Sequence, residues 1–281
     1  MTVEATARKA YGILEPLVAM IYFVPEGPTN YEKLGLKPRQ GYFCSRSAAL
    51  GAVPGEVVAA TFYNFNPAIV IPLVDEGWKI TTPQATAEAR NQAVVEALTH
   101  LIAEEDGTVP DVSRAVALSR KATANLKMEG RPLFAAHQAQ PWPESNDLLS
   151  LWWGANLLRE FRGDGHIAAL LANDISGLEA LLMAIGWSER AAQMKTMLFK
   201  TRVWSDEQMA EAYKDLEARG LMQGETLTEA GRALRDSIEE TTDKLAVAPW
   251  RNLGDEAEEY LDLIKPLTKR ILERGGLGVR R

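Results

Sequence analysis

The sequence predicts an all-α fold with one small β-hairpin, arranged as two related helical halves. Alternating strand patterns are almost absent, whereas apolar residues recur at the three- to four-residue spacing of helices. The hairpin is predicted at Leu221–Thr226, where Gly224 marks a tight turn between two helical segments. Similar runs of helices follow Gly41 and Gly165, and this similarity predicts the two related halves.

The helices of the first half are marked by their ends. Thr82-Pro83 is a typical N-cap and first-turn pair, and it predicts a helix over residues 84–105. Asp106-Gly107 ends this helix, and Pro110 begins another that reaches about Leu126. One apolar stripe of the first helix faces the expected core: Ala87, Val94, Val95, Leu98, Leu101 and Ile102.

A proline-rich segment separates the halves. Residues 130–146 contain Pro132, Pro141 and Pro143 without helical spacing, so we expect an irregular linker. The predicted organisation is a winged-helix-like first domain at 1–130, a linker at 131–146, and a second domain at 147–281. Helices of the second domain are expected over 147–162, 166–173, 176–185 and 189–199, with a last helix over 255–273.

The two halves are expected to derive from a duplication. Trp78 and Trp204 lie at nearly the same distance from the start of each half, and each precedes a polar N-cap and a long helix. Few identities accompany this spacing, so chance similarity between two alanine-rich helical stretches is the alternative.

The segment Ser205–Arg232 carries a motif. Ser205-Asp206-Glu207-Gln208 opens a helix that ends near Arg219-Gly220, and Leu227-Thr228-Glu229-Ala230-Gly231 opens the next one after the hairpin. This order of helix, Arg-Gly-Leu, hairpin and Leu-Thr-Glu-Ala-Gly resembles the winged helix of MarR-type transcriptional regulators. The resemblance implies a DNA-recognition helix over 205–219, and a homodimer formed through the terminal helices.

The charge of that segment opposes DNA binding. Duplex DNA is a dense row of negative charge and is normally bound by Lys and Arg. The surface that would meet DNA instead holds only Lys214, Arg219 and Arg232 against a larger acidic set: Asp206, Glu207, Glu211, Asp215, Glu217, Glu225 and Glu229. The net charge of −7 agrees. We therefore expect no DNA partner, unless a basic surface elsewhere takes over: Arg114, Arg120, Lys121 and Lys127.

A second resemblance covers most of the chain. Its residues are Trp153-Gly154-Ala155-Asn156, continuing through Gly163-Asp164-Gly165-His166 to Gly177-Leu178-Glu179-Ala180-Leu181, with Tyr22-Phe23, Gly41-Tyr42-Phe43 and Ala60–Phe65 in the first half. The sequence is similar to a family of actinobacterial helix-turn-helix fold proteins. This resemblance implies a winged-helix architecture and brings no settled activity with it.

Several classes of site are disfavoured. Cys44 is the only cysteine, which excludes an intrachain disulfide and a multi-cysteine metal cluster. His100, His137 and His166 are scattered, so no metal site is predicted, and no motif identifies a cofactor. The apolar runs are too short to span a bilayer and no signal peptide is evident, so we expect a cytoplasmic protein without a membrane partner.

The segment Arg159–His166, which includes Arg159, Glu160 and Arg162, is a candidate site. Two glycines bracket Asp164, which suggests a turn between helices, with Asp164 capping the helix that begins near His166. At a helix start His166 would be held neutral and ready to accept a proton. His166 and Asp164 are therefore candidate catalytic residues, and Arg162 and His166 candidate ligand contacts. A structural role for both is the alternative.

Aromatic residues of the first half form the other candidate site. Tyr22, Phe23, Tyr42 and Tyr63 are close in sequence, and Arg46 lies on the same helical face as Tyr42, four residues on. Aromatic walls with a few polar groups are typical of a small-molecule pocket, although an ordinary core is the alternative.

Three functions follow from these features. The first is a small-molecule-binding protein, taking an anionic or aromatic ligand on a winged-helix scaffold that does not bind DNA. The second is a ligand-responsive transcriptional regulator. The third is an enzyme that uses Asp164, His166, Arg46 or a tyrosine for acid–base chemistry, and a structural, dimerising protein is a further alternative.

Overall fold

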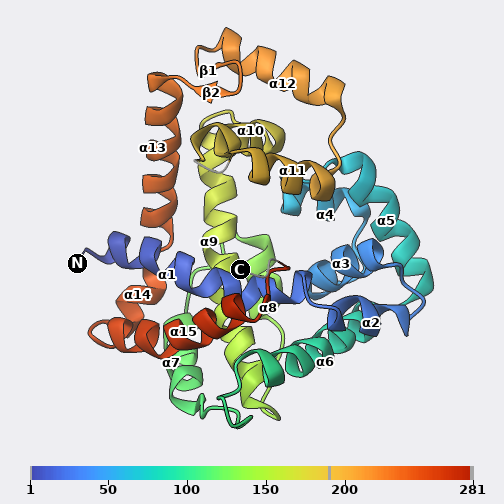
Figure 1. The fold of residues 1–281 in the computed structure, drawn as a ribbon, viewed down its shortest axis with the longest axis vertical. Helices are drawn as coiled ribbons and strands as arrows, with labels where there is room; N and C mark the ends of the chain where they lie inside the picture. The colour runs from blue at the N-terminus through green and yellow to red at the C-terminus, as the bar shows by residue number, and fades with distance from the viewer. Residues whose placement is uncertain (1, 189–190, 279–281) are drawn as a thin grey trace.

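Helices dominate the computed structural model, which describes residues 2–188 and 191–278 (Figure 1). The described residues form one sheet, an antiparallel hairpin in which β1 (Met222–Gln223) pairs with β2 (Thr226–Leu227). This arrangement confirms the predicted helical fold with one small hairpin.

The chain is best followed in two runs. Up to the predicted linker the helices are α1 (Val3–Ala19), η1 (Met20–Tyr22), α2 (Glu26–Glu32), α3 (Pro38–Ser47), η2 (Ala48–Leu50), α4 (Gly55–Phe62), α5 (Pro67–Ile80), α6 (Pro83–Leu101) and α7 (Ser113–Thr123). From there on they are α8 (Pro132–Gln138), α9 (Asp147–Ala172), α10 (Gly177–Trp187), α11 (Ala191–Arg202), α12 (Asp206–Ala218), α13 (Glu229–Leu245), α14 (Ala248–Leu253) and α15 (Glu256–Glu273).

Helix α9 is the axis of the main core. It is apolar around most of its circumference, which is the pattern of a helix enclosed by others. Helices α1, α6, α7, α8 and α13 pack against it, and α15 packs on α1 (Figure 1). The core therefore joins residues from both sides of the predicted linker, such as Leu17, Leu98 and Leu151. The division at residues 131–146 stays a prediction.

A second core lies at the opposite end of the molecule, under α10, α11, α12 and the hairpin. Local signals define these elements: Ser205 and Gln208 form a capping box at the start of α12, and Thr228 caps α13. Gly220, just after α12, and Gly224, in the turn between β1 and β2, take the positive φ that these positions require. Helix α13 then runs back along α9 to the main core (Figure 1).

Two local predictions are wrong. The predicted break at Gly163–Gly165 does not occur, because α9 is one continuous 26-residue helix. Gly165 serves close packing instead: a Cβ there would lie 3.0 Å from Arg131 Nη1 and 3.2 Å from the Leu245 Cβ. Residues 132–138 of the expected irregular linker form α8, which buries Leu133 and Phe134.

Two further expectations remain predictions. The duplication is one, since helices follow Gly41 and Gly165 in both halves but the described hairpin follows the second run only. The homodimer is the other, and the apolar face of α15 is used within this chain, where Tyr260, Leu261 and Ile264 are buried in the main core. Among the described helices, none is long and apolar enough by itself to cross a membrane, and only the pair α9 and α10, bent by 99°, meets that test together.

Candidate functional site

A cavity of about 700 Å³ separates the main core from the α10–α12 end. Helices α1, α3, α4, α9, α10, α11 and α13 contribute its walls. Every site residue predicted from the sequence lines it: Tyr22, Phe23, Tyr42, Arg46, Tyr63, Arg162, Asp164 and His166. The structure thus brings the two candidate sites into one, and their binding role stays a prediction.

One wall of the cavity is aromatic. The Tyr42 ring contacts Tyr22 and Phe65, with ring centroids 5.0 and 5.7 Å apart, and Phe62 lies 6.2 Å from Phe65. Helix α3 packs closely against α2 at Gly41, which has no side chain. A Cβ on Gly41 would lie 2.4 Å from the Tyr31 ring. Phe23 is 44% exposed. This wall offers ring faces to an apolar or aromatic ligand.

Tyr63 takes a different role. Its hydroxyl donates to the Ile175 carbonyl oxygen at 2.5 Å, and its ring packs into the second core. Burial, with Glu179 and Asp174 nearby, raises the pKa of this phenol. Tyr63 therefore ties α4 to the start of α10, with its hydroxyl already satisfied.

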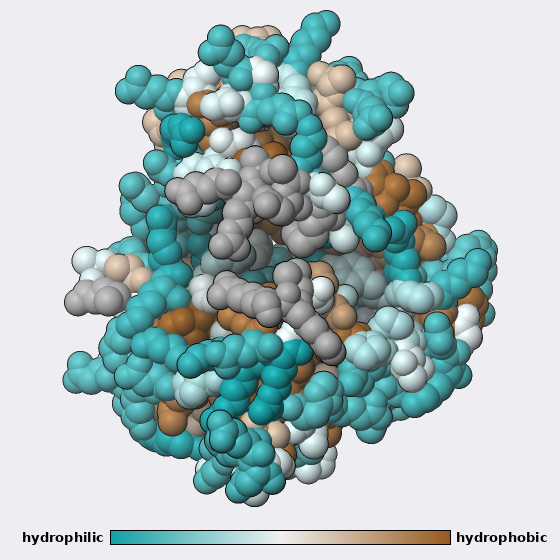
Figure 2. All heavy atoms as spheres, viewed as in Figure 1, coloured by the Kyte–Doolittle hydropathy of each residue, from teal (hydrophilic) through white to brown (hydrophobic). Residues whose placement is uncertain are grey.

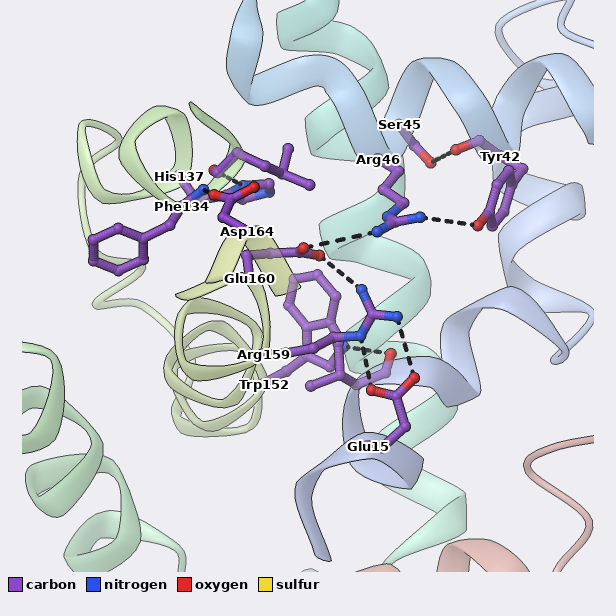
Figure 3. A network of polar contacts seen from close by, with 12 residues as sticks. Glu15, Tyr42, Ser45, Arg46, Phe134, His137, Trp152, Arg159, Glu160 and Asp164 are labelled. Carbon is purple, nitrogen blue, oxygen red and sulfur yellow. Dashed lines mark hydrogen bonds and ion pairs between the residues drawn. The ribbon is translucent and has the colours of Figure 1, made fainter. Parts of the chain in front are cut away.

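A chain of charged side chains crosses the cavity (Figure 3). Arg46 lies 3.7 Å from Glu160 and also donates from Nη1 to the Tyr42 hydroxyl at 3.3 Å. Glu160 accepts from Arg159 at 2.9 Å, and Arg159 holds Glu15 of α1 through two hydrogen bonds. Burial opposes ionisation of Glu160, but Arg159 and Arg46 outweigh it and lower its pKa. Glu160 is thus a buried carboxylate between two guanidinium groups.

A second charged group joins α9 to α13. Arg162 donates to Glu239 at 3.0 Å and to Asp243 at 3.1 Å, and its Nε is buried without a partner among the described residues. His166 Nδ1 lies 2.9 Å from the Thr242 hydroxyl, which itself donates to the Ile238 carbonyl. The hydroxyl therefore accepts from Nδ1–H, leaving Nε2 as the unprotonated nitrogen.

The expected environment of His166 is partly wrong. The residue lies inside α9 rather than at a helix start, so the helix dipole does not hold it neutral. Burial does this instead: it lowers the pKa of His166, against the opposing effect of Glu239. The carboxylates that act on His166 are thus Glu239 and Asp243 of α13, and not Asp164.

Asp164 faces α8. Its Oδ2 accepts the Phe134 amide proton at 2.9 Å, so it caps α8 rather than a helix beginning at His166 (Figure 3). Burial raises its pKa to about 6, against the Phe134 hydrogen bond. Asp164 and His166, two residues apart on one helix, point to different neighbours. The structure does not bring them together as an acid–base pair.

Sequence reasoning missed several residues of the cavity. Glu15, Arg202 and Glu239 line it and belong to neither candidate site. Arg159 and Glu160 also line it, and they lie within the candidate segment without an assigned role, although such a charged pair in an otherwise apolar run requires buried partners. Nothing local marks Glu15 or Arg202.

The surface of α12 and the hairpin is exposed and acidic. Every residue of the predicted acidic set, from Asp206 to Glu229, is exposed, and Lys214, Arg219 and Arg232 are the exposed cations beside it. Arg219 is already paired with Glu179 at 3.1 Å. In Figure 2 this end of the molecule carries mainly hydrophilic residues on the face shown.

No metal centre is formed by the residues in ranges 2–188 and 191–278, where no three His, Cys, Asp or Glu side chains gather suitably. A model of a helix-turn-helix family matches residues 7–278, which is nearly the whole chain. No curated protein and no solved structure matches the sequence. The family match thus extends over both cores and the cavity between them.

Proposed function

Since the chain belongs to this helix-turn-helix family, we propose that it is a small-molecule-binding protein on a winged-helix scaffold of the MarR type. The order α12, β1, β2, α13 supports the winged helix, with α12 in the place of the recognition helix. The single observation that carries the proposal is the open cavity of about 700 Å³, which is lined by helices from both ends of the molecule.

The size and lining of the cavity suit an organic ligand. Pockets for such ligands span about 300–1,000 Å³ and combine apolar walls with a few polar groups. Here Phe62 and Phe65 supply the apolar wall, and Arg46 and Arg162 supply buried guanidinium groups whose Nε atoms lack described partners. A polar ligand group would satisfy these donors.

The charge of α12 supports a role apart from DNA. Acidic side chains repel phosphates at the surface where a regulator needs attraction. The basic surface considered as a substitute is largely neutralised, since Arg114 pairs with Glu259 at 2.7 Å, Arg120 pairs with Glu144 at 3.1 Å, and Lys121 pairs with Glu256. At low salt we expect no submicromolar binding to duplex DNA.

The binding proposal is tested with the fluorescent probe N-phenyl-1-naphthylamine, followed by its displacement from a metabolite collection. We expect saturable binding of one probe molecule. Ala184→Trp fills the cavity from α10 and should abolish binding, whereas Ala218→Trp, at an exposed position on α12, should leave it unchanged. Equal binding by both variants would place the probe elsewhere and refute the proposal.

A ligand-responsive regulator is the second candidate, and one observation favours it. Thr201 and Arg202 line the cavity from the end of α11, directly before α12. Asn66, which follows the cavity residue Phe65, also donates to the Val203 carbonyl at 2.9 Å and to Gln208 of α12 at 3.1 Å. A ligand in the cavity would therefore affect the position of α12. Duplex binding that appears or disappears with the cavity ligand would favour this function over the first.

A further inference from the structure

Two partly buried arginines face the aromatic wall of the cavity. The Arg46 Cζ lies 4.3 Å from the centre of the Phe62 ring, and the Arg202 Cζ lies 4.0 Å from the centre of the Phe65 ring. Since Phe62 and Phe65 are neighbours in that wall, the two guanidinium groups belong to one corner of the cavity.

The arginine of α11 has no counter-ion among the described residues. Arg202 donates from Nε to Asn64 at 3.1 Å and from Nη1 to Thr201 at 3.0 Å. No carboxylate of a described residue lies within 4.0 Å of it, and its Nη2 makes no hydrogen bond to the described part of the chain. A mostly buried guanidinium without an opposite charge is costly unless something binds it.

The arginine of α3 is only partly compensated. Arg46 shares Glu160 with Arg159: the Arg46–Glu160 distance is 3.7 Å and the Arg159–Glu160 distance is 2.9 Å. The Nε of Arg46 is buried without a partner in the described residues. Glu15 is the other carboxylate of this group, and it is held by Arg159. Three arginines thus stand against two carboxylates, which leaves one positive charge in this corner. The pKa of Arg202 is lowered, chiefly by burial, and the positive charges of Arg46 and Arg159 lower it further against the opposing effect of Tyr42.

Tyr42 completes the corner. Its hydroxyl oxygen accepts from Arg46, and its proton is not given to any described residue. Its ring lies 5.7 Å from Phe65, so the hydroxyl and both guanidinium groups surround the same aromatic surface. Donors with surplus positive charge above ring faces are suited to an anion attached to an aromatic body.

We propose that the cavity ligand is an aromatic anion whose carboxylate, sulfonate or phosphate group binds between Arg46 and Arg202. The same group accepts a hydrogen bond from the Tyr42 hydroxyl. This inference rests on the proposed small-molecule function and specifies its ligand class. The aromatic body lies against Phe62 and Phe65.

A matched pair of probes tests it. 1-Anilinonaphthalene-8-sulfonate and N-phenyl-1-naphthylamine differ only in the sulfonate group, and both fluoresce on entering an apolar cavity. In the wild-type protein we expect the sulfonate probe to bind at least about tenfold more tightly, since hydrogen bonds to charged groups contribute that much or more. Arg202→Gln should remove about tenfold of the sulfonate affinity and leave the neutral probe unchanged.

Two controls guard the interpretation. Arg251→Gln changes an exposed arginine on α14, away from the cavity lining, and should keep the wild-type preference. Ala184→Trp should abolish binding of both probes, which assigns them to the cavity. Displacement by 2-naphthoate and by 2-naphthyl phosphate then distinguishes a carboxylate from a phosphate ligand, with 2-naphthol as the neutral comparison.

The outcomes separate the two proposals. Cavity binding of both probes with equal affinity overturns the anion subsite and leaves the small-molecule function standing. Binding of neither probe overturns both. If Arg202→Gln weakens the two probes equally, or 2-naphthol displaces as well as the anions, the arginine corner does not select charge and the inference is wrong.

Discussion

Replacing Asp164 with Asn should flatten the pH dependence of stability between about pH 4 and pH 7. The carboxyl group is only 4% exposed and caps α8 through the Phe134 amide. Burial favours its neutral form and raises its pKa from the ordinary 3.8 to about 6. The asparagine amide can accept the same hydrogen bond but does not ionise, so the substitution isolates the effect of the charge.

The sign and size follow from linkage between protonation and folding. A carboxyl whose pKa is higher in the folded state binds its proton more tightly there, so folding is favoured at low pH. That stability is fully present below about pH 4 and is lost as the pH rises through about 6. Each pH unit between the two pKa values is worth about 1.4 kcal/mol, which gives about 3 kcal/mol for ionised Asp164. Because Asp164 lines a solvent-accessible cavity, screening reduces the expected figure to about 2 kcal/mol.

The assay is urea denaturation of wild type and Asp164→Asn at half-unit steps from pH 4 to pH 7. The difference in unfolding free energy should change by about 2 kcal/mol in favour of the variant as the pH rises. Asp174→Asn, at an exposed position, serves as the control and should follow the wild-type profile. Parallel profiles for wild type and Asp164→Asn would refute the reasoning, because they would show that the carboxyl group titrates alike in the folded and unfolded chain.

Three further substitutions test the packing around the cavity. Glu160→Gln leaves Arg46 and Arg159 facing each other without the shared carboxylate and should lower the unfolding free energy by about 3 kcal/mol in urea denaturation, whereas unchanged stability would contradict the buried network. Gly177→Ala places a Cβ 2.0 Å from the Tyr63 carbonyl oxygen and should lower the free energy of unfolding by about 2 kcal/mol or more. Gly12→Ala, with nothing within 4 Å of the new Cβ, is the control and should be neutral or slightly stabilising. Equal midpoints of thermal unfolding for the two variants would count against the close approach of α10 to α4. Asn66→Ala removes the hydrogen bonds to Val203 and Gln208 and should increase amide hydrogen exchange at the start of α12, and unchanged exchange there would exclude Asn66 as a tie to that helix.

Much of the secondary structure was accessible from the sequence. The pair Thr82-Pro83 correctly predicted the start of α6, and Ser205 with Gln208 predicted the start of α12. These signals are reliable because an N-cap side chain accepts a hydrogen bond from a backbone amide only two or three residues further along the chain. The acidity of α12 was equally readable, since its charged residues lie on a solvent-exposed face whatever the rest of the chain does.

The candidate site was predictable only in part. The tyrosines and Arg46 were found because they are concentrated in a short stretch of sequence, and they do line the cavity. The prediction that Asp164 caps a helix beginning at His166 was wrong, because it took the two glycines beside Asp164 as a turn. Packing of α9 in the core overrides that weak local preference, and the helix continues.

The helical fold, the starts of α6 and α12 and the charge of the α12 surface were thus readable from the sequence, because they depend on neighbours within a turn or two. The set of charges that share the cavity was not, because it depends on how the helices pack. Arg159 meets Glu15 across 144 residues, and Arg202 reaches the corner of Arg46 from the far half of the chain. The physical reason is that buried charges find their partners through helix packing, and sequence spacing carries no record of that proximity.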